Sequence, residues 1–123
     1  MKKLIKIVED IQNSASSKEK CMHYSIRLVE ALKKEGIEAY VYTFPPLSLS
    51  YSHYYVVAYV AGEKYIIDAY PLGRGVSSAA RYIISLWKDA IYYRDGYAIS
   101  EEESTDWKQI VKSLRQENAT LPG

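Results

Sequence analysis

The chain has a single cysteine, a single phenylalanine and almost no net charge. One cysteine excludes an internal disulfide and suits a reducing compartment. The 16 basic and 15 acidic residues give a net charge of +1 and form no block of one sign. The charge pattern therefore gives no indication of nucleic-acid binding. No apolar run approaches the ~20 residues of a membrane span, and the run after the basic start is too short for a signal peptide. The sequence therefore predicts a cytoplasmic protein with no nucleic-acid or membrane partner.

Metal ligands and phosphate-binding loops are also scarce. Two histidines and one thiol lack the paired spacing that metal sites use. The short segment Leu72–Gly75 fits a turn better than a phosphate-binding loop. We therefore expect no metal and no cofactor. Tyrosine is abundant, with 13 copies, which suits half-buried strands first and an adhesive surface second.

The apolar pattern predicts one α+β domain over residues 1–123. The expected strands cluster in the middle of the chain, which favours an antiparallel sheet with helices packed on it. Ser16 to Glu19 matches a capping box that opens the second helix, and Gly62–Glu63 fits a hairpin turn. Residues 117–123 are expected to fray. The expected helices span residues 2–13, about 16–35, 77 or 78 to 92 and 105–116, and the expected strands span 37–44, 53–61, 64–70 and 97–99.

Cys21 lies near the start of the second expected helix, on its apolar face. Unpaired backbone N–H groups and the helix dipole favour an anion there, and hence the reactive thiolate. Cys21 is expected about one turn into the helix, so this help is partial and a partner base is needed. His23 falls on the opposite, solvent-facing side of the same helix and is not that base.

His53 and Asp68 complete a pattern of nucleophile, base and orienting carboxylate. His53 opens a strand that is apolar almost throughout, and Asp68 ends a strand whose pattern predicts burial. A buried carboxylate is costly without a partner, and a histidine on the adjacent strand would supply one. The alternative is a structural His53–Asp68 pair beside an inert core thiol. A turn at Gly62–Glu63 sets Asp68 opposite Val57, ~13 Å along the strand from His53, so a triad needs a bulge, a strong twist or a shifted register.

Two stretches carry a resemblance to a known superfamily. Cys21-Met-His-Tyr-Ser-Ile-Arg-Leu-Val-Glu-Ala-Leu-Lys-Lys-Glu-Gly-Ile, then His53 and Ile-Ile-Asp68-Ala-Tyr-Pro71, resemble the papain-like and transglutaminase-like cysteine enzymes. The likeness covers roughly residues 18 to 75 and is greatest to the small papain-fold toxin domains of bacteria. It implies a papain-like fold, in which an N-terminal catalytic helix and further helices pack on a central antiparallel sheet of three or more strands.

The resemblance also implies roles for individual residues. Cys21 resembles the nucleophile, His53 the general base and acid, and Asp68 the residue that fixes the imidazole. The Cys21 backbone N–H would hold the oxyanion, with an upstream amide from Gln12 or Asn13. The papain pattern has a glutamine where this chain has Ala15. Three side chains of the loop before His53 either line a substrate groove or cover the core: Leu47, Leu49 and Tyr51.

The sequence thus predicts a cysteine hydrolase or deamidase of the papain-like type. It would transfer the acyl group of an amide in a peptide or protein substrate, by peptide hydrolysis or by glutamine deamidation. The resemblance implies a bacterial toxin or effector domain, active in its own or a target cytoplasm, with a neutralising immunity protein as partner. The alternatives are a catalytically silent papain-like domain that binds a protein partner through a tyrosine-rich surface, and a purely structural domain.

Overall fold

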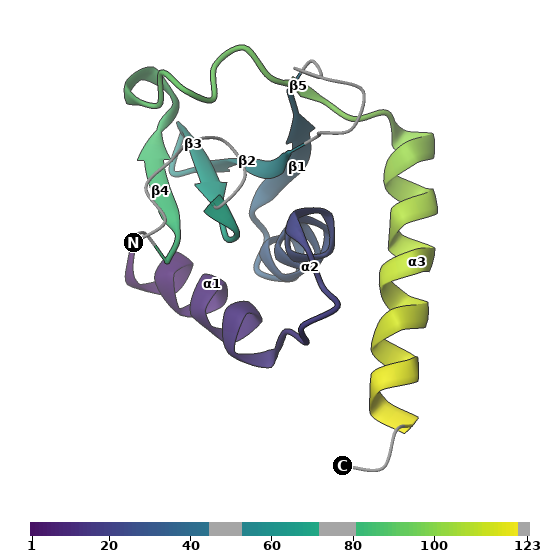
Figure 1. Ribbon diagram of the computed structural model, residues 1–123. Coiled ribbons are helices and arrows are strands. Elements are labelled where there is room, and N and C mark those ends of the chain that lie inside the picture. The colour runs from purple at the N-terminus through teal and green to yellow at the C-terminus, as the bar shows by residue number, and fades with distance from the viewer. Residues whose placement is uncertain (45–52, 72–80, 121–123) are drawn as a thin grey trace.

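The computed structural model describes residues 1–44, 53–71 and 81–120, with side chains to residue 116. In this part the chain is α+β, with three α-helices and a five-stranded antiparallel sheet of order β4-β3-β2-β1-β5 (Figure 1). The elements are α1 (Lys2–Ser14), α2 (Cys21–Lys34), β1 (Glu38–Thr43), β2 (Tyr54–Val60), β3 (Glu63–Asp68), β4 (Ile83–Leu86), the 3-10 helix η2 (Trp87–Asp89), β5 (Tyr97–Ala98) and α3 (Glu101–Thr120).

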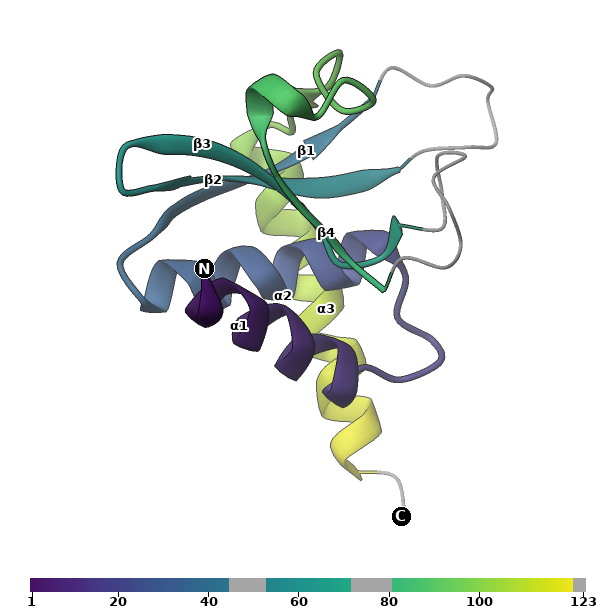
Figure 2. The ribbon, with the colours of Figure 1, turned by 90° about the vertical axis from the view of Figure 1, so that its left-hand side faces the viewer.

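One face of the sheet is covered by helices, as Figure 2 shows from the side. The amphipathic pattern of α1 and α2 turns their apolar stripes toward the sheet, and strand alternation sends every second residue of β1 and β2 to meet them. Each fully buried aliphatic side chain in this layer contributes roughly 1.5–3 kcal/mol. The main core contains Leu4 and Val8 of α1, Ile26, Leu28, Val29 and Leu32 of α2, and Ala39, Val41, Val56, Ala58 and Ile67 of the strands.

The opposite face of the sheet carries a second, more aromatic core. The chain after β4 folds back over this face through η2 and the following turns. Its buried members are Phe44, Tyr55, Val57, Ile66, Ala90 and Tyr93. Several tyrosines therefore pack against strands, as their number predicted, and this core extends to the end of the sheet where His53 and Asp68 lie.

The helix expected from residue 77 or 78 to Tyr92 is wrong over the residues that the structure describes. Residues 83–86 form β4, residues 87–89 form η2, and residues 77–80 lie outside the described residues. The apolar spacing fits either period, but β-branched Ile83 and Ile84 favour a strand. Pairing with β4 satisfies the outer backbone groups of β3, which a helix here would have left as an open edge.

The last helix is longer than expected at both ends. It begins at Glu101 because the Ser100 hydroxyl accepts the Glu103 backbone N–H at 3.1 Å, and three glutamates fill its first turn, where the helix dipole favours acids. The helix runs to Thr120 and so extends into the segment 117–123 for which fraying is expected, and residues 121–123 lie outside the described residues. No helix in the described ranges combines the length and the apolar character needed to cross a bilayer.

Candidate active site

The nucleophile candidate stands at the first residue of α2, not one turn in as expected. Residues 16–19 form a separate turn, in which the Glu19 N–H donates to the Ser16 carbonyl at 3.1 Å. The helix proper opens with the Tyr24 N–H donating to the Lys20 carbonyl at 3.0 Å. The N–H groups before this bond have no acceptor within the helix, so the positive end of the dipole lies at Cys21 itself. The thiol is half-buried.

The β2–β3 hairpin turns at Ala61–Gly62, one residue earlier than predicted. Both turn residues have positive φ, +51° at Ala61 and +80° at Gly62, as a two-residue type I′ turn requires. Sequence preference pointed elsewhere because alanine rarely adopts this conformation. The strand pairs on either side run from Val60↔Glu63 to Val56↔Ile67 without interruption.

This register brings Asp68 within reach of His53. Since Ile67 pairs with Val56, the next residue, Asp68, comes opposite Tyr55, which is two residues along the strand from His53. Such diagonal neighbours on one face lie ~7–8 Å apart, which two side chains can bridge. The shifted register alone closes the gap, and neither a bulge nor an unusual twist is needed.

The His53 imidazole and the Asp68 carboxylate form a buried pair. His53 Nε2 lies 2.6 Å from Asp68 Oδ2, and each residue is 1% exposed. The carboxylate accepts two more hydrogen bonds, from the Tyr70 backbone N–H to Oδ1 at 3.0 Å and from the Tyr93 hydroxyl to Oδ2 at 2.8 Å. Three donors therefore fix its orientation, and the pair has the hydrogen bonds that a buried charge needs.

The same imidazole hydrogen-bonds the side chain of Cys21. Burial by itself lowers the pKa of His53, but the hydrogen bonds to Asp68 and Cys21, with the charges of these two groups, outweigh it and raise the pKa to about 9. His53 is therefore an imidazolium at neutral pH. Because Nε2 faces Asp68, Nδ1 is the ring nitrogen left for the sulfur. The structure thus brings the three residues Cys21, His53 and Asp68 into one hydrogen-bonded line.

Backbone and ring contacts hold the imidazole in place. The Thr43 hydroxyl donates to the His53 carbonyl at 2.9 Å, which ties the start of β2 to the end of β1. The rings of Phe44 and Tyr55 stack near the imidazole, with centroids at 6.1 and 6.5 Å. Rigid support of this kind keeps a base oriented toward its nucleophile.

The side-chain amide of Gln12, one of the two expected oxyanion residues, is hydrogen-bonded to other groups. Gln12 Nε2 donates to the carbonyls of Ala69 at 3.1 Å and Arg81 at 2.5 Å. Both amide hydrogens are therefore used to tie α1 to the segments beside β3 and β4, and none is left for an oxyanion. Asn13 is exposed near the end of α1. The groove candidates Leu47, Leu49 and Tyr51 lie outside the described residues.

His23 is not the solvent-facing residue that the helical pattern predicted. Its ring is half-buried, with its edge on Trp107 of α3 at 6.1 Å between centroids, and its Nδ1 accepts the Lys20 N–H at 3.0 Å. Burial lowers the pKa of His23, with Glu19 raising it and Lys20 lowering it by smaller amounts. His23 thus caps α2 and contacts α3. The helical pattern of apolar residues does not predict the partial burial of His23, because α3 covers that side of α2 only in the tertiary structure.

Sequence reasoning also missed Tyr93, the third donor to the triad carboxylate. Its hydroxyl bonds Asp68, and its carbonyl accepts the Tyr55 hydroxyl at 2.6 Å. Tyr93 falls just beyond the helix that the sequence predicts up to residue 92, and the strand β4 found in place of that helix lets the following chain bring Tyr93 to this face. No local signal in the sequence identifies it.

Within residues 1–44, 53–71 and 81–120, no group of three or more His, Cys, Asp or Glu side chains is arranged to hold a metal ion. Comparison of the chain with family models, with curated proteins and with solved structures found no match.

Proposed function

We propose that this chain is a thiol-dependent acyl-transfer enzyme that acts on an amide, by peptide hydrolysis or by glutamine deamidation. Cys21 is the nucleophile, His53 the proton carrier and Asp68 the residue that orients the imidazole. The observation that supports this most directly is the hydrogen-bonded line from the sulfur through the imidazolium to a buried carboxylate. A histidine with a raised pKa beside a half-buried thiol at a helix start is the environment in which cysteine becomes a nucleophile.

The proposed reaction begins from a thiolate and an imidazolium. The Cys21 sulfur attacks the amide carbonyl carbon, and the oxyanion that forms accepts a hydrogen bond from the Cys21 backbone N–H. His53 then gives its proton to the amide nitrogen, which leaves as an amine, or as ammonia in a deamidation, as the C–N bond breaks and a thioester remains. Neutral His53 next takes a proton from water, whose hydroxide attacks the thioester and releases the acid. The products are the carboxylic acid and the original ion pair.

The fold and setting of the enzyme are proposed from the sequence resemblance. A papain-like arrangement has its nucleophile at the start of a helix, its base at the start of a strand and its carboxylate on the neighbouring strand. Here Cys21 begins α2, His53 directly precedes β2 and Asp68 ends β3. The same resemblance supports a bacterial toxin or effector domain that acts on a peptide or protein and is neutralised by a partner protein.

The direct test is labelling of intact protein with a peptide amide that carries a thiol-directed electrophile. The native chain is expected to gain the mass of one label, and Cys21→Ser none. His53→Ala is expected to react much more slowly, since it loses the cation beside the sulfur. If His53→Ala reacts as fast as the native chain, the imidazole does not activate the thiol and the proposal fails.

A second candidate is a catalytically silent domain that binds a protein partner through its tyrosines. Among the described residues four tyrosine side chains are exposed: Tyr40, Tyr59, Tyr92 and Tyr97, at 41%, 37%, 67% and 52%. Exposed tyrosine is common at protein interfaces. This candidate predicts that the amide electrophile labels Cys21 no faster than free cysteine, so the same labelling experiment separates the two functions.

A further inference from the structure

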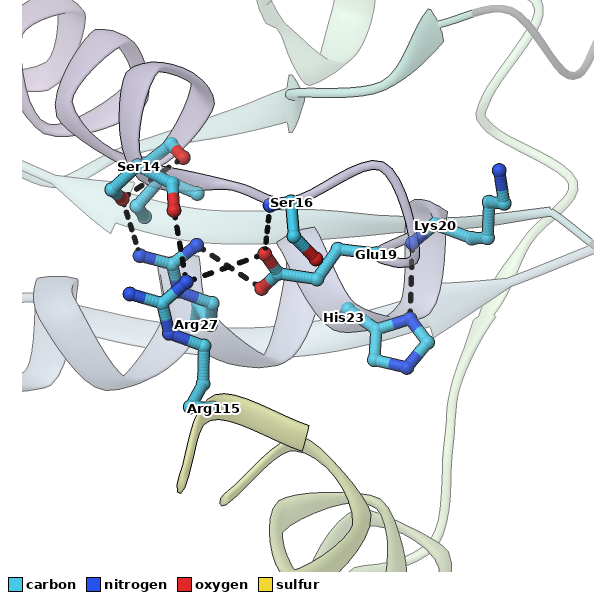
Figure 3. A network of polar contacts seen from close by, with 8 residues as sticks. Ser14, Ser16, Glu19, Lys20, His23, Arg27 and Arg115 are labelled. Atoms are coloured by element: carbon cyan, nitrogen blue, oxygen red, sulfur yellow. Dashed lines mark hydrogen bonds and ion pairs between the residues drawn. The ribbon is translucent and has the colours of Figure 1, made fainter. Parts of the chain in front are cut away.

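A buried carboxylate outside the triad holds two arginines in fixed positions (Figure 3). The side chain of Glu19 has no solvent exposure and accepts the Ser16 backbone N–H at 2.6 Å. It pairs with Arg27 of α2 at 3.2 Å and with Arg115 of α3 at 3.4 Å. Both arginines also bond Ser14 at the end of α1, Arg27 to its hydroxyl at 2.6 Å and Arg115 to its carbonyl at 2.8 Å. The cluster therefore fixes two guanidinium groups side by side.

These guanidinium groups keep hydrogen-bonding capacity. A guanidinium has five N–H donors. Within the described residues, Arg27 uses two N–H donors in hydrogen bonds to Glu19 and Ser14, and Arg115 uses two in hydrogen bonds to the same residues. The remaining donors are already ordered, so a ligand that accepts them loses little side-chain entropy in doing so.

The same two arginines line a cavity of about 290 Å³ between α2 and α3. Lys108 and Lys112 of α3 line it too, and among the described side chains Glu30 of α2 is the only carboxylate that lines it. Even when the buried Glu19 behind the arginines is counted, four cations face two carboxylates. The cavity therefore has a positive potential that its own residues do not neutralise.

The spacing of the cations on α3 adds to this imbalance. Lys108 and Lys112 are four residues apart and Arg115 follows three residues later, so all three lie on one side of the helix. None has a carboxylate three or four residues away in the sequence. In the part of the chain that the structure describes, neither lysine forms an ion pair. Like charges at this spacing repel one another, and a bound anion would offset that repulsion.

We propose that this cavity between α2 and α3 is an anion site that binds the phosphate group of a small molecule. Phosphate fits because a planar guanidinium can donate two parallel hydrogen bonds to its oxygens, and a dianion best offsets several cations. The volume is just below the range of about 300–1,000 Å³ for drug-sized ligands, which suits a phosphate with a small substituent. The site uses none of Cys21, His53 and Asp68, so it does not rest on the proposed enzymatic function.

The test is a titration of the full chain with inorganic phosphate, followed by the backbone amide NMR signals of α2 and α3. Sodium chloride keeps the ionic strength constant, since screening alone shifts the signals of exposed charges. The native chain is expected to show saturable shifts confined to residues around the cavity. A parallel titration with glycerol 3-phosphate shows whether a small ester is bound more tightly than the free ion.

Two double variants with equal loss of charge decide the outcome. Lys108→Gln with Lys112→Gln is expected to weaken phosphate binding by about tenfold for each charge-assisted hydrogen bond lost. Lys33→Gln with Lys88→Gln removes two exposed lysines elsewhere and is expected to bind as the native chain does. Shifts that never saturate, or an equal loss of binding in both double variants, would mean that phosphate is attracted only by the net charge of the chain and does not bind in the cavity. Either result would overturn the proposal.

Discussion

Replacing Asp68 by asparagine removes the charge that His53 faces at 2.6 Å while keeping the size of the side chain. The folded pKa of His53 is about 9, against an ordinary value of 6.5. At about 1.4 kcal/mol per pH unit, this difference corresponds to about 3 kcal/mol of stability. Cys21 supplies part of the effect, so the share that Asp68→Asn removes is at most about 3 kcal/mol.

The sign of the pH dependence follows from a raised pKa. A histidine that is more basic in the folded state stabilises the fold fully below its unfolded pKa of about 6.5, and this contribution disappears as the pH rises through about 9. Asp68→Asn lacks most of this stabilisation at every pH. Without the carboxylate, burial disfavours the charged imidazolium and lowers the pKa of His53. The native chain should therefore exceed Asp68→Asn in stability by more at pH 6 than at pH 10.

Urea unfolding followed by tryptophan fluorescence, in the presence of a reductant, measures both stabilities. Asp106→Asn is the matched control, since Asp106 is exposed on α3 and its loss should change stability little at either pH. A difference between the native chain and Asp68→Asn that is the same at pH 6 and pH 10 would refute the ion pair between His53 and Asp68.

Three further changes test the elements that hold the site. Ala61→Asn should stabilise the chain by about 0.5–1 kcal/mol in thermal unfolding, because asparagine tolerates the positive φ of this turn position, and an unchanged midpoint would contradict the turn assignment. Gly96→Ala should destabilise it by about 1–3 kcal/mol, since the added methyl group would collide with the Tyr55 hydroxyl, and a neutral result in urea unfolding would contradict that close packing. Tyr93→Phe should cost about 1–3 kcal/mol and slow alkylation of Cys21, because the triad carboxylate loses a buried donor, whereas native-like alkylation kinetics would show that Tyr93 has no part in positioning it.

The parts of the site that the sequence predicted are those with a local signal. An apolar strand opened by His53 and an acid that ends a buried strand are visible in the order of residues, and burial of the acid implied a partner. The α+β class followed from strands gathered between helices, and the short strand near Tyr97 was predicted and is present as β5. These inferences needed no knowledge of the tertiary contacts.

The errors have other causes: one is a local conformation that its residue disfavours, and the others depend on contacts between distant residues. The hairpin register depended on Ala61 accepting a positive φ that its side chain disfavours. The strand β4 is selected over a helix by its pairing with β3, which adjacent residues do not encode. His23 contacts Trp107 of α3 and Gln12 binds the carbonyls of Ala69 and Arg81, and neither contact can be read from neighbouring residues in the sequence.

The rate of Cys21 alkylation by iodoacetamide near pH 6 tests the proposed activation of the thiol most directly. Free cysteine is almost wholly a thiol at that pH and reacts slowly, whereas the proposed activation by His53 would make Cys21 reactive there. We expect Cys21 in the native chain to react at least about tenfold faster than free cysteine at pH 6, and His53→Ala to lose that advantage. A native rate equal to that of free cysteine, or one that survives the loss of His53, would contradict the account.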